Sequence, residues 1–384
     1  MRFPLITLPR ETIELDESLF QEKIIGTIDP YQIRKWGKYR TVSRARVDDI
    51  DAKILGLLQE DPRTTYLLLS KECQVSIDSV RRRYERLKSE GVVVREIISL
   101  HPRAVGIDCI SWLGIITEPG METEVVESLN KRPEVGMNFI EIGKYNIRSV
   151  LSLKHLDDLD PFVDSLKKIP YVKDIDVMLW SDIGKMAYPR NLVIESYQGS
   201  RENETAKTET DSDPEEIKTS STTYLVQKEK TVPPVTILSH VLDSTDATIL
   251  GILSTNARIP FSTIAKQIGI STKTVICRYK KLKKDFVAYS TLALNLRKLG
   301  YNGYASYNIK VSSKSWVKDV FDKLIKVPNV VVALKLIGPY NINVLAPFNS
   351  PEQLMRTHAC ISKIPGIERI DQQIGDSLHV WPAR

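Results

Sequence analysis

The chain has 384 residues, enough for two or three ordinary domains, so a single domain is not expected. Hydrophobic residues make up 42% and charged residues 27%, which is typical of a protein that folds in water and excludes a fibrous or wholly disordered chain. The net charge of +6 is compatible with a polyanionic partner but does not by itself indicate one. The four cysteines are widely spaced and no apolar run is long enough for a membrane helix, so we expect a cytoplasmic protein without disulfide framework, bound metal, cofactor or membrane contact.

The N-terminal extension, residues 1–47, matches no other part of the chain. Its stretch 32–46 contains six basic residues interleaved with Trp36 and Tyr39. A segment of this kind could contact nucleic acid as an arm, or it could pack against the domain that follows. The sequence leaves both alternatives open.

Most of the remaining chain consists of two copies of one pattern, 195 residues apart. DAKILGLL at 51–58 recurs as DATILGIL at 246–253, and IGKYNI at 142–147 recurs as IGPYNI at 337–342. Chance similarity of amphipathic helices would not reproduce turn residues as well as apolar ones. The pattern therefore indicates a duplication.

The alignment of the two copies slips by one residue over part of its length. VG at 105–106 pairs with LG at 299–300, and the original spacing returns before Pro133 and Pro328. A change of loop length at the surface produces such a slip without altering the elements on either side.

The segment between the copies, residues 195–238, is rich in Ser, Thr, Glu and Lys and has almost no aliphatic pattern. This composition predicts a disordered linker. Such a linker has a root-mean-square span of roughly 35 Å. The two copies can therefore lie side by side or act separately.

Each copy begins with a predicted three-helix domain, at 48–100 and 242–295. In the first copy Asp48 is placed to cap the helix DDIDAKILGLLQE, and Asp51 stands in capping-box position. Asp243 caps the corresponding helix of the second copy.

A second, shorter helix is expected from about Thr64 to Cys73, and from Ile259 to Ile268. After a tight turn, Ser76 and Ser271 are suitable N-caps for a third helix. Three helices with a tight turn between the last two predict a helix-turn-helix.

The third helix of each copy has an apolar stripe and a basic face. Val80, Tyr84 and Leu87 form the stripe in the first copy and recur as Val275, Tyr279 and Leu282, so we expect them in the core. A basic helix face is often only a solvated surface, but here it follows a tight turn, begins at an N-cap and recurs, which favours major-groove binding. The predicted DNA-contacting residues are Ser76, Ser79, Arg81, Arg82, Arg83, Arg86, Ser271, Lys273, Thr274, Arg278, Lys280 and Lys281.

The two third helices differ in charge. Residues 76–88 have five basic and two acidic residues, a net +3, whereas 271–284 have six basic and no acidic residues, a net +6. We hypothesise that the second copy supplies more nonspecific phosphate affinity and that the arginine-rich first copy reads more of the sequence.

After the third helix the pattern becomes β-like, first at 92–100 and 287–295. Each copy then continues with a strand, a helix, two strands around the IG-x-YNI turn, a helix and a strand. This order predicts ferredoxin-like βαββαβ domains at 101–190 and 296–384, each an antiparallel sheet covered by helices on one face. The expected fold class is α+β, with two winged-helix-like helix-turn-helix domains that each precede such a domain.

Four motifs in combination give the chain a family likeness: D-x-x-I-L-x-x-L, the arginines Arg63 and Arg258, S-x-x-x-V-x-x-R-Y-x-x-L, and G-x-Y-N. Over residues 48–185 and 243–380 the chain resembles the Lrp/AsnC family of feast/famine transcription regulators. The resemblance implies that the helix-turn-helix binds double-stranded DNA. It also implies that the βαββαβ domain dimerises through its sheet and binds an amino acid or similar small effector.

The effector-loop positions that the resemblance implies are Gly143, Tyr145, Asn146, Gly338, Tyr340 and Asn341. Family members often have Asp where this chain has the two Asn residues, and a neutral amide cannot pair ionically with a ligand ammonium group. The alternative is that G-x-Y-N is only a hairpin turn with Gly at a special backbone angle.

The duplication allows two assemblies. The copies could pair within one chain as a pseudo-dimer with two different recognition helices, which would favour an asymmetric DNA site. Two chains could instead pair copy one with copy one and form a four-headed homo-oligomer. The sequence does not decide between them.

Other function classes find less support in the residues. The five histidines are scattered, and neither a zinc-protease motif nor a phosphate-cradling loop is present, so we do not expect an enzyme. Siroheme decarboxylases use a related architecture, so such an enzyme or a tetrapyrrole-binding protein is the alternative. A third class is a ligand-binding or assembly protein whose helix-turn-helix no longer contacts DNA.

Overall fold

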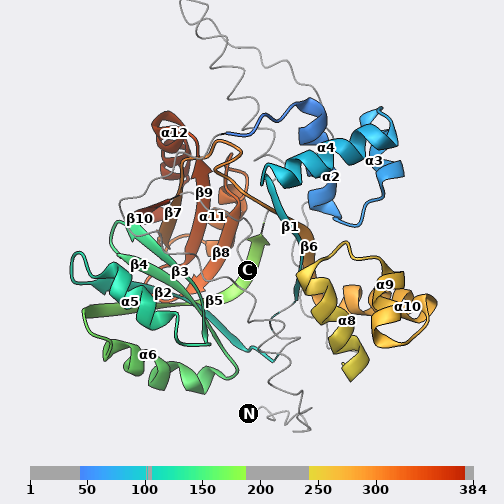
Figure 1. Cartoon of the computed structure of the whole chain (residues 1–384). Coiled ribbons are helices and arrows are strands. Elements are labelled where there is room, and N and C mark those ends of the chain that lie inside the picture. The colour runs from blue at the N-terminus through green and yellow to red at the C-terminus, as the bar shows by residue number, and fades with distance from the viewer. Residues whose placement is uncertain (1–43, 101, 103–105, 187–241, 377–384) are drawn as a thin grey trace, which may run out of the picture.

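The structure is a computed structural model that describes residues 44–100, 102, 106–186 and 242–376 (Figure 1). The linker predicted at 195–238 lies outside these ranges. So does the predicted N-terminal extension, apart from residues 44–47.

Two three-helix units form the heads of the molecule. We call them head one and head two. Head one consists of α2 (Asp49–Glu60), α3 (Tyr66–Cys73) and α4 (Ile77–Ser89). Head two consists of α8 (Ser244–Thr255), α9 (Phe261–Ile268) and α10 (Thr272–Asp285).

The predicted caps are confirmed. The Asp51 amide donates to Asp48 Oδ1 at 2.8 Å, and the Asp48 amide donates to Asp51 Oδ2 at 3.2 Å, which makes the capping box of α2. Ser76 and Ser271 cap α4 and α10. The middle helices begin two residues later than expected, because Thr65 and Pro260 occupy their N-cap positions.

The predicted core stripes are also confirmed. The apolar residues of α4 and α10 named above are all buried, and they pack in the cores of their own heads. This burial holds each third helix against the other two and turns its opposite face outward.

The β-like segments that follow the heads form strands β1 (Val93–Leu100) and β6 (Val287–Leu294), which pair with each other in antiparallel orientation. Each strand also packs into the head of the other copy. Ile98 of β1 lies in the core of head two, and Leu292 and Leu294 of β6 lie in the core of head one. The ribbon formed by β1 and β6 therefore ties the two heads into one unit.

Two equivalent arginines clamp the heads together. Arg63 donates to the carbonyl oxygens of Ala257 (2.6 Å) and Ile259 (3.1 Å), and its guanidinium lies 3.8 Å from the ring centre of Phe261. Arg258 makes the reciprocal bonds to the carbonyls of Pro62 and Thr64. Arg63 and Arg258, which belong to the motifs shared with the family, thus join head one to head two.

We expect Arg63→Ala to lower the free energy of unfolding by about 2–3 kcal/mol, because it removes two hydrogen bonds from a charged donor and leaves two carbonyls of head two without them. Urea denaturation followed by circular dichroism measures this loss. Lys266→Ala, which removes an exposed cation from α9, serves as the matched control and should change stability little. Equal effects of the two variants would contradict the clamp.

The remainder of each copy has the predicted βαββαβ order. In copy one the elements are β2 (Cys109–Thr117), α5 (Glu122–Leu129), β3 (Val135–Ile142), β4 (Ile147–Leu153), α6 (Leu159–Lys167) and β5 (Val172–Met186). In copy two they are β7 (Gly303–Val311), α11 (Val317–Leu324), β8 (Val332–Ile337), β9 (Ile342–Phe348), α12 (Pro351–Ser362) and β10 (Ile367–Asp376). The α+β fold class is confirmed.

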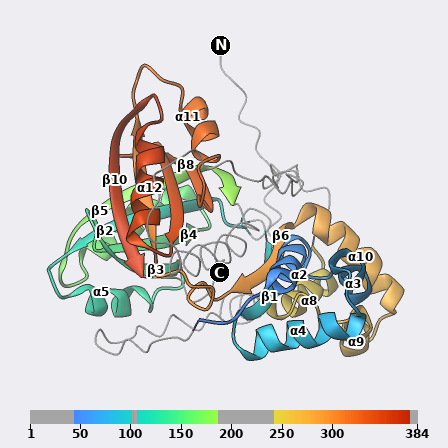
Figure 2. The same cartoon turned by 90° about the horizontal axis from the view of Figure 1, so that it is seen from above.

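The two sheets join edge to edge and close. Within the copies the strands lie in the order β3-β4-β2-β5 and β8-β9-β7-β10, and the pairs β5–β8 and β10–β3 complete an eight-stranded barrel. The helices cover its outside, and both heads lie on one side of it (Figures 1 and 2). In the part of the chain that the structure describes, no helix is both long and apolar enough for a membrane span.

Candidate nucleic-acid interface

The outward faces of α4 and α10 carry most of the predicted DNA-contacting side chains. Among these residues, the exposed ones are Ser76, Arg81, Arg82, Ser271, Lys273, Thr274, Lys280 and Lys281, and the half-buried ones are Ser79, Arg83, Arg86 and Arg278. The structure thus brings most of the predicted residues of each copy together on one helix face, but not Arg83 and Arg278. Their contacts with DNA stay a prediction.

Arg83 and Arg278 have an intramolecular role that the sequence did not indicate. Arg83 Nη1 lies 2.6 Å from Asp48 Oδ2 and 2.9 Å from Asp51 Oδ1. Arg278 Nη1 pairs in the same way with Asp243 Oδ2 (2.5 Å) and Asp246 Oδ1 (2.8 Å). Each arginine therefore ties the third helix of its head to the capped end of the first helix.

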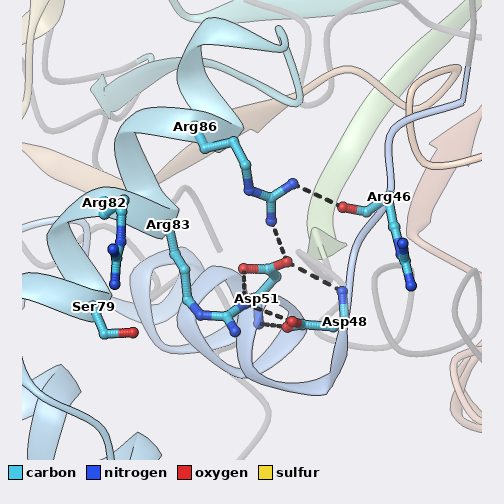
Figure 3. Close-up of a pocket in the computed structure, with 7 residues that line it drawn as sticks. All are labelled: Arg46, Asp48, Asp51, Ser79, Arg82, Arg83 and Arg86. Carbon is cyan, nitrogen blue, oxygen red and sulfur yellow. Dashed lines mark hydrogen bonds and ion pairs between the residues drawn. The ribbon is translucent and has the colours of Figure 1, made fainter.

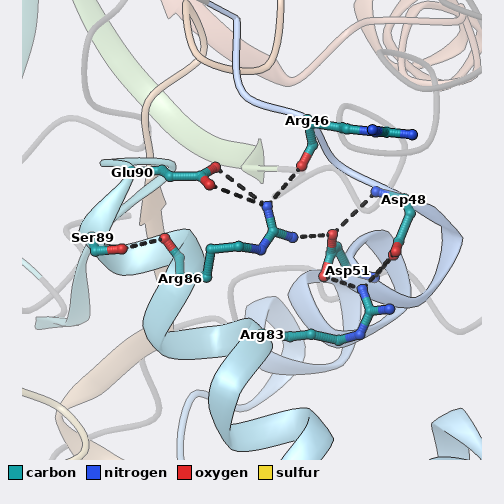
Figure 4. A network of polar contacts seen from close by, with 7 residues as sticks. All are labelled: Arg46, Asp48, Asp51, Arg83, Arg86, Ser89 and Glu90. Atoms are coloured by element: carbon teal, nitrogen blue, oxygen red, sulfur yellow. Dashed lines mark hydrogen bonds and ion pairs between the residues drawn. The ribbon is translucent and has the colours of Figure 1, made fainter.

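Arg86 is bound within head one as well. Its guanidinium contacts the Asp51 carboxylate and Glu90, and it donates to the Arg46 carbonyl oxygen at 3.0 Å (Figure 4). The Asp51 side chain is almost completely buried, so it is shielded from solvent and its ion pairs are screened less than surface pairs. These contacts hold the chain before α2 against the C-terminal half of α4.

A cavity of about 450 Å³ opens beside this network (Figure 3). It is lined by Arg46, Asp48, Asp51, Ser79, Arg82, Arg83 and Arg86. Arg46 and Arg82 are exposed and lie on opposite sides of it in Figure 3. The lining has four arginines against two aspartates, so the cavity favours an anion.

Head two differs from head one at the equivalent positions. Cys277 stands where head one has Arg82, and Lys281 stands where head one has Arg86. Position 241, equivalent to Arg46, lies outside the described residues. The arginine-rich lining is therefore a property of head one.

The carboxylates at the caps have lowered pKa values. Burial raises the pKa of Asp48, but the hydrogen bonds from the Asp51 amide and from Arg83 outweigh it and hold that pKa below its ordinary value. The pKa of Asp243 is lowered in the same way by the Asp246 amide and by Arg278, which outweigh the effect of burial.

We expect the melting temperature of the heads to fall as the pH drops below about 4. A lowered folded-state pKa contributes stability that is fully present above the ordinary carboxyl pKa and is lost as the pH falls through the folded value. Thermal unfolding between about pH 7 and pH 3 measures this drop. Combining Asp48→Asn with Asp243→Asn should make the drop shallower, and an unchanged profile would refute the assignment.

The six predicted effector positions lie where the two copies meet. Gly143 has a φ of +154°, and a Cβ there would lie 2.7 Å from the Gln372 carbonyl oxygen on β10 of the other copy. Gly338, with a φ of +143°, is equally close to the Val177 carbonyl oxygen on β5. Both positions therefore require glycine.

The asparagines of the G-x-Y-N loops bind backbone. Asn146 Oδ1 accepts from the Thr117 amide at 3.0 Å, and Asn341 Oδ1 accepts from the Val311 amide at 2.9 Å. Each side chain thereby fixes the end of the neighbouring central strand. This geometry favours the hairpin-turn interpretation for the two Asn residues.

The tyrosines of these loops bind carboxylates. Tyr145 donates to Asp176 Oδ2 at 2.7 Å, and Lys144 Nζ lies 2.8 Å from the same oxygen. Tyr340 donates to Asp371. Sequence reasoning missed Asp176 and Asp371, because the final strand of each copy is far from the loop in the chain.

Comparison with known proteins identifies the family. The AsnC-type helix-turn-helix domain matches residues 47–88 and 242–283. An uncharacterized HTH-type transcriptional regulator of Pyrococcus horikoshii is 32% identical over 148 residues, which cover 94% of that protein and 38% of this chain. The chain belongs to the Lrp/AsnC family of transcription regulators. This Lrp/AsnC-family chain carries the family's helix-turn-helix twice.

One further regulator and one solved structure also resemble this chain. The HTH-type transcriptional regulator FL11 of Pyrococcus furiosus is 27% identical over 136 residues, 90% of that protein and 35% of this chain. The crystal structure of the siroheme decarboxylase NirDL resembles the chain with a TM-score of 0.55 at 15% identity, over 85% of this chain and 91% of that one. This second likeness concerns the fold of both copies together.

Proposed function

We propose that this Lrp/AsnC-family regulator binds double-stranded DNA as a single two-headed unit, with α4 and α10 in major grooves of one site. The observation that carries the proposal is the pair of basic, solvent-facing third helices on heads that β1, β6, Arg63 and Arg258 hold in a fixed relation. Fixed heads impose a fixed spacing between the two half-sites.

The exposed residues divide into two roles. Arg81 of head one can bind a guanine edge in the groove, whereas Lys273, Lys280 and Lys281 of head two suit phosphate contacts. Ser79 and Thr274 add hydroxyl groups at equivalent positions. We propose that Arg83, Arg86 and Arg278 act indirectly, because their ion pairs with the cap carboxylates position the recognition helices.

The arginine-lined cavity of head one fits a phosphate of the DNA backbone. Arg46 and Arg82 would grip the phosphate from its two sides, outside the groove that α4 reads. Replacing them by Val and Cys, the residues of copy two, should reduce the salt dependence of DNA binding by about one phosphate contact.

We further propose that a small effector binds at the G-x-Y-N loops. A ligand ammonium group at the G-x-Y-N loops would pair with Asp176 or Asp371, the carboxylates that hold the two loop tyrosines, and not with the Asn residues. Calorimetric titration with the amino acids tests this. Absence of both heat and thermal shift would remove the effector from the proposal.

The decisive experiment is binding of the purified protein to fragmented genomic DNA at two salt concentrations, with sequencing of the retained fragments. Enrichment of discrete fragments with a steep salt dependence supports a sequence-specific regulator and gives the half-site spacing. Absence of retention at low salt would refute DNA binding.

A second candidate function is enzymatic. The fold shared with the siroheme decarboxylase NirDL extends over 85% of this chain, which is the observation that favours it. Addition of siroheme to the purified protein, followed by absorbance of the bound tetrapyrrole and analysis of the products, tests it. Decarboxylated product would establish the enzyme, whereas unchanged siroheme together with specific DNA binding favours the regulator.

A further inference from the structure

A buried ion pair on copy one is completed by hydroxyl groups of copy two, at the centre of the barrel. Arg148 Nη2 lies 2.6 Å from Glu141 Oε1, and both side chains are 1% exposed. Arg148 Nη1 donates to the Ser306 hydroxyl at 2.8 Å, and the Tyr304 hydroxyl donates to Glu141 Oε1 at 2.7 Å. Each member of the pair on copy one therefore has one partner on copy two.

The polar contacts continue into copy two. Asn343 Nδ2 donates to the Ser306 hydroxyl (2.9 Å) and to Asn308 Oδ1 (2.7 Å). Asn308 Nδ2 donates to Gln373 Oε1 at 2.8 Å, and all four of these residues are buried. The rings of Trp112 and Phe139 lie beside the Arg148 guanidinium, at 4.4 and 5.2 Å from their centres.

The two inner faces differ at equivalent positions. Strands β2 and β4 pair in the same register as β7 and β9, since Leu113 opposite Ser149 corresponds to Tyr307 opposite Val344. This register fixes the counterparts of the residues above: Leu336 for Glu141, Asn343 for Arg148, Ser306 for Trp112, and Tyr304 for Ile110. The charged pair and the hydroxyl groups that complete it therefore stand on different copies.

Pairing of copy one with a second copy one would break these contacts. Glu141 would face Ile110 in place of the Tyr304 hydroxyl, and Arg148 would face the indole of Trp112 in place of Ser306. A buried ion pair would lose its added hydrogen bonds, and a large ring would enter the space of a small side chain. Pairing of copy two with copy two would leave the Tyr304 hydroxyl opposite Leu336, without its acceptor.

We infer that the buried Arg148–Glu141 pair makes copy one select copy two as its partner and reject a second copy one. Covalent linkage gives copy two of the same chain a high effective concentration, so the chain closes on itself. The four-headed arrangement is disfavoured because its interface would lose the hydrogen bonds from Arg148 to Ser306 and from Tyr304 to Glu141. This inference rests on the barrel alone and is independent of what the heads bind.

Disulfide reporters in the full-length chain distinguish the two pairings, once the exposed Cys277 and Cys360 are replaced by serine. Leu179 lies opposite Ile337 across β5 and β8, so Leu179→Cys with Ile337→Cys reports closure within the chain. Ile142 is the counterpart of Ile337. Leu179→Cys with Ile142→Cys therefore gives a covalent dimer only where copy one pairs with copy one.

With the barrel otherwise unaltered, oxidation should form the disulfide of the first reporter, Leu179→Cys with Ile337→Cys, within one 43.6 kDa chain. The second reporter, Leu179→Cys with Ile142→Cys, should give little covalent dimer. The double variant Glu141→Leu/Arg148→Asn, which places the residues of copy two on copy one, should raise the dimer of the second reporter about tenfold or more. Abundant dimer before that change, or no increase in a folded double variant, would overturn the inference.

Two milder variants keep the test decisive if the double variant does not fold. Tyr304→Phe and Ser306→Ala remove only the hydroxyl groups of copy two and leave the ion pair in place. Each should give a smaller increase of the same covalent dimer, with circular dichroism as the check of folding. Absence of an increase in both folded variants would overturn the inference as well.

Discussion

Arg148→Met should lower the free energy of unfolding by about 3–5 kcal/mol. The substitution leaves the Glu141 carboxylate in the barrel without its cation, and Arg148 and Glu141 are both buried at the junction of the copies. Burial raises the pKa of Glu141, and Arg148 and Tyr304 oppose that rise, so loss of the arginine favours the neutral carboxyl. Urea denaturation at neutral pH measures the loss.

The matched control is the double variant Glu141→Leu/Arg148→Met. Removing both charges eliminates the unpaired carboxylate, so the double variant should recover most of the stability that the single variant loses. A double variant as unstable as Arg148→Met would show that the loss comes from packing of the guanidinium against Trp112 and Phe139, and not from the charge.

Replacing Lys273, Lys280 and Lys281 by alanine should weaken DNA binding on the order of several hundredfold at about 0.1 M salt. These side chains are exposed on the outer face of α10, and each phosphate contact contributes a slope of about 0.9 to the dependence of log K on log salt. The slope should therefore fall by about 2.7. Fluorescence anisotropy over a salt series measures both quantities.

The control removes the same charge elsewhere. Lys318, Lys323 and Lys326 are exposed at α11 and the turn after it, on the outside of the barrel and away from the heads (Figure 2). Their replacement by alanine should change affinity little. If both triple variants lost affinity equally, DNA binding would depend on net charge and not on α10.

The local elements follow from local chemistry, which the sequence contains. Asp48, Ser76 and Ser271 satisfy free amides at helix starts, and a period of about 3.6 residues buries Val80, Tyr84 and Leu87 on one side of α4. The β-like alternation and the shared turns predict the βαββαβ order. The basic faces of α4 and α10 are the sides that these stripes leave outward.

The charged residues at the candidate site were harder to interpret. Arg83 and Arg278 belong to the same basic helices as the exposed residues, but Arg83 stands next to Arg82, and Arg278 stands two positions before Lys280. This spacing turns both arginines away from the exposed face and toward the first helix. The signal that could have found them is the pair of carboxylates at each capping box, a ready partner for an arginine on a packed helix. Only the packing of the two helices brings that pair of carboxylates to Arg83 and Arg278 and leaves Arg82 exposed.

The sequence by itself determined the duplication, the elements of each copy, their caps and their core stripes, because these depend on residues within a few positions of one another. Only the tertiary structure decided that β1 pairs with β6, that Arg63 and Arg258 clamp the heads, and that the two sheets close into one barrel. Because the two copies are similar, the edge strands β3 and β5 of copy one could pair with copy two or with another copy one. The choice between them depends on contacts such as Arg148 with Ser306, which are 158 residues apart and exist only after the chain has folded.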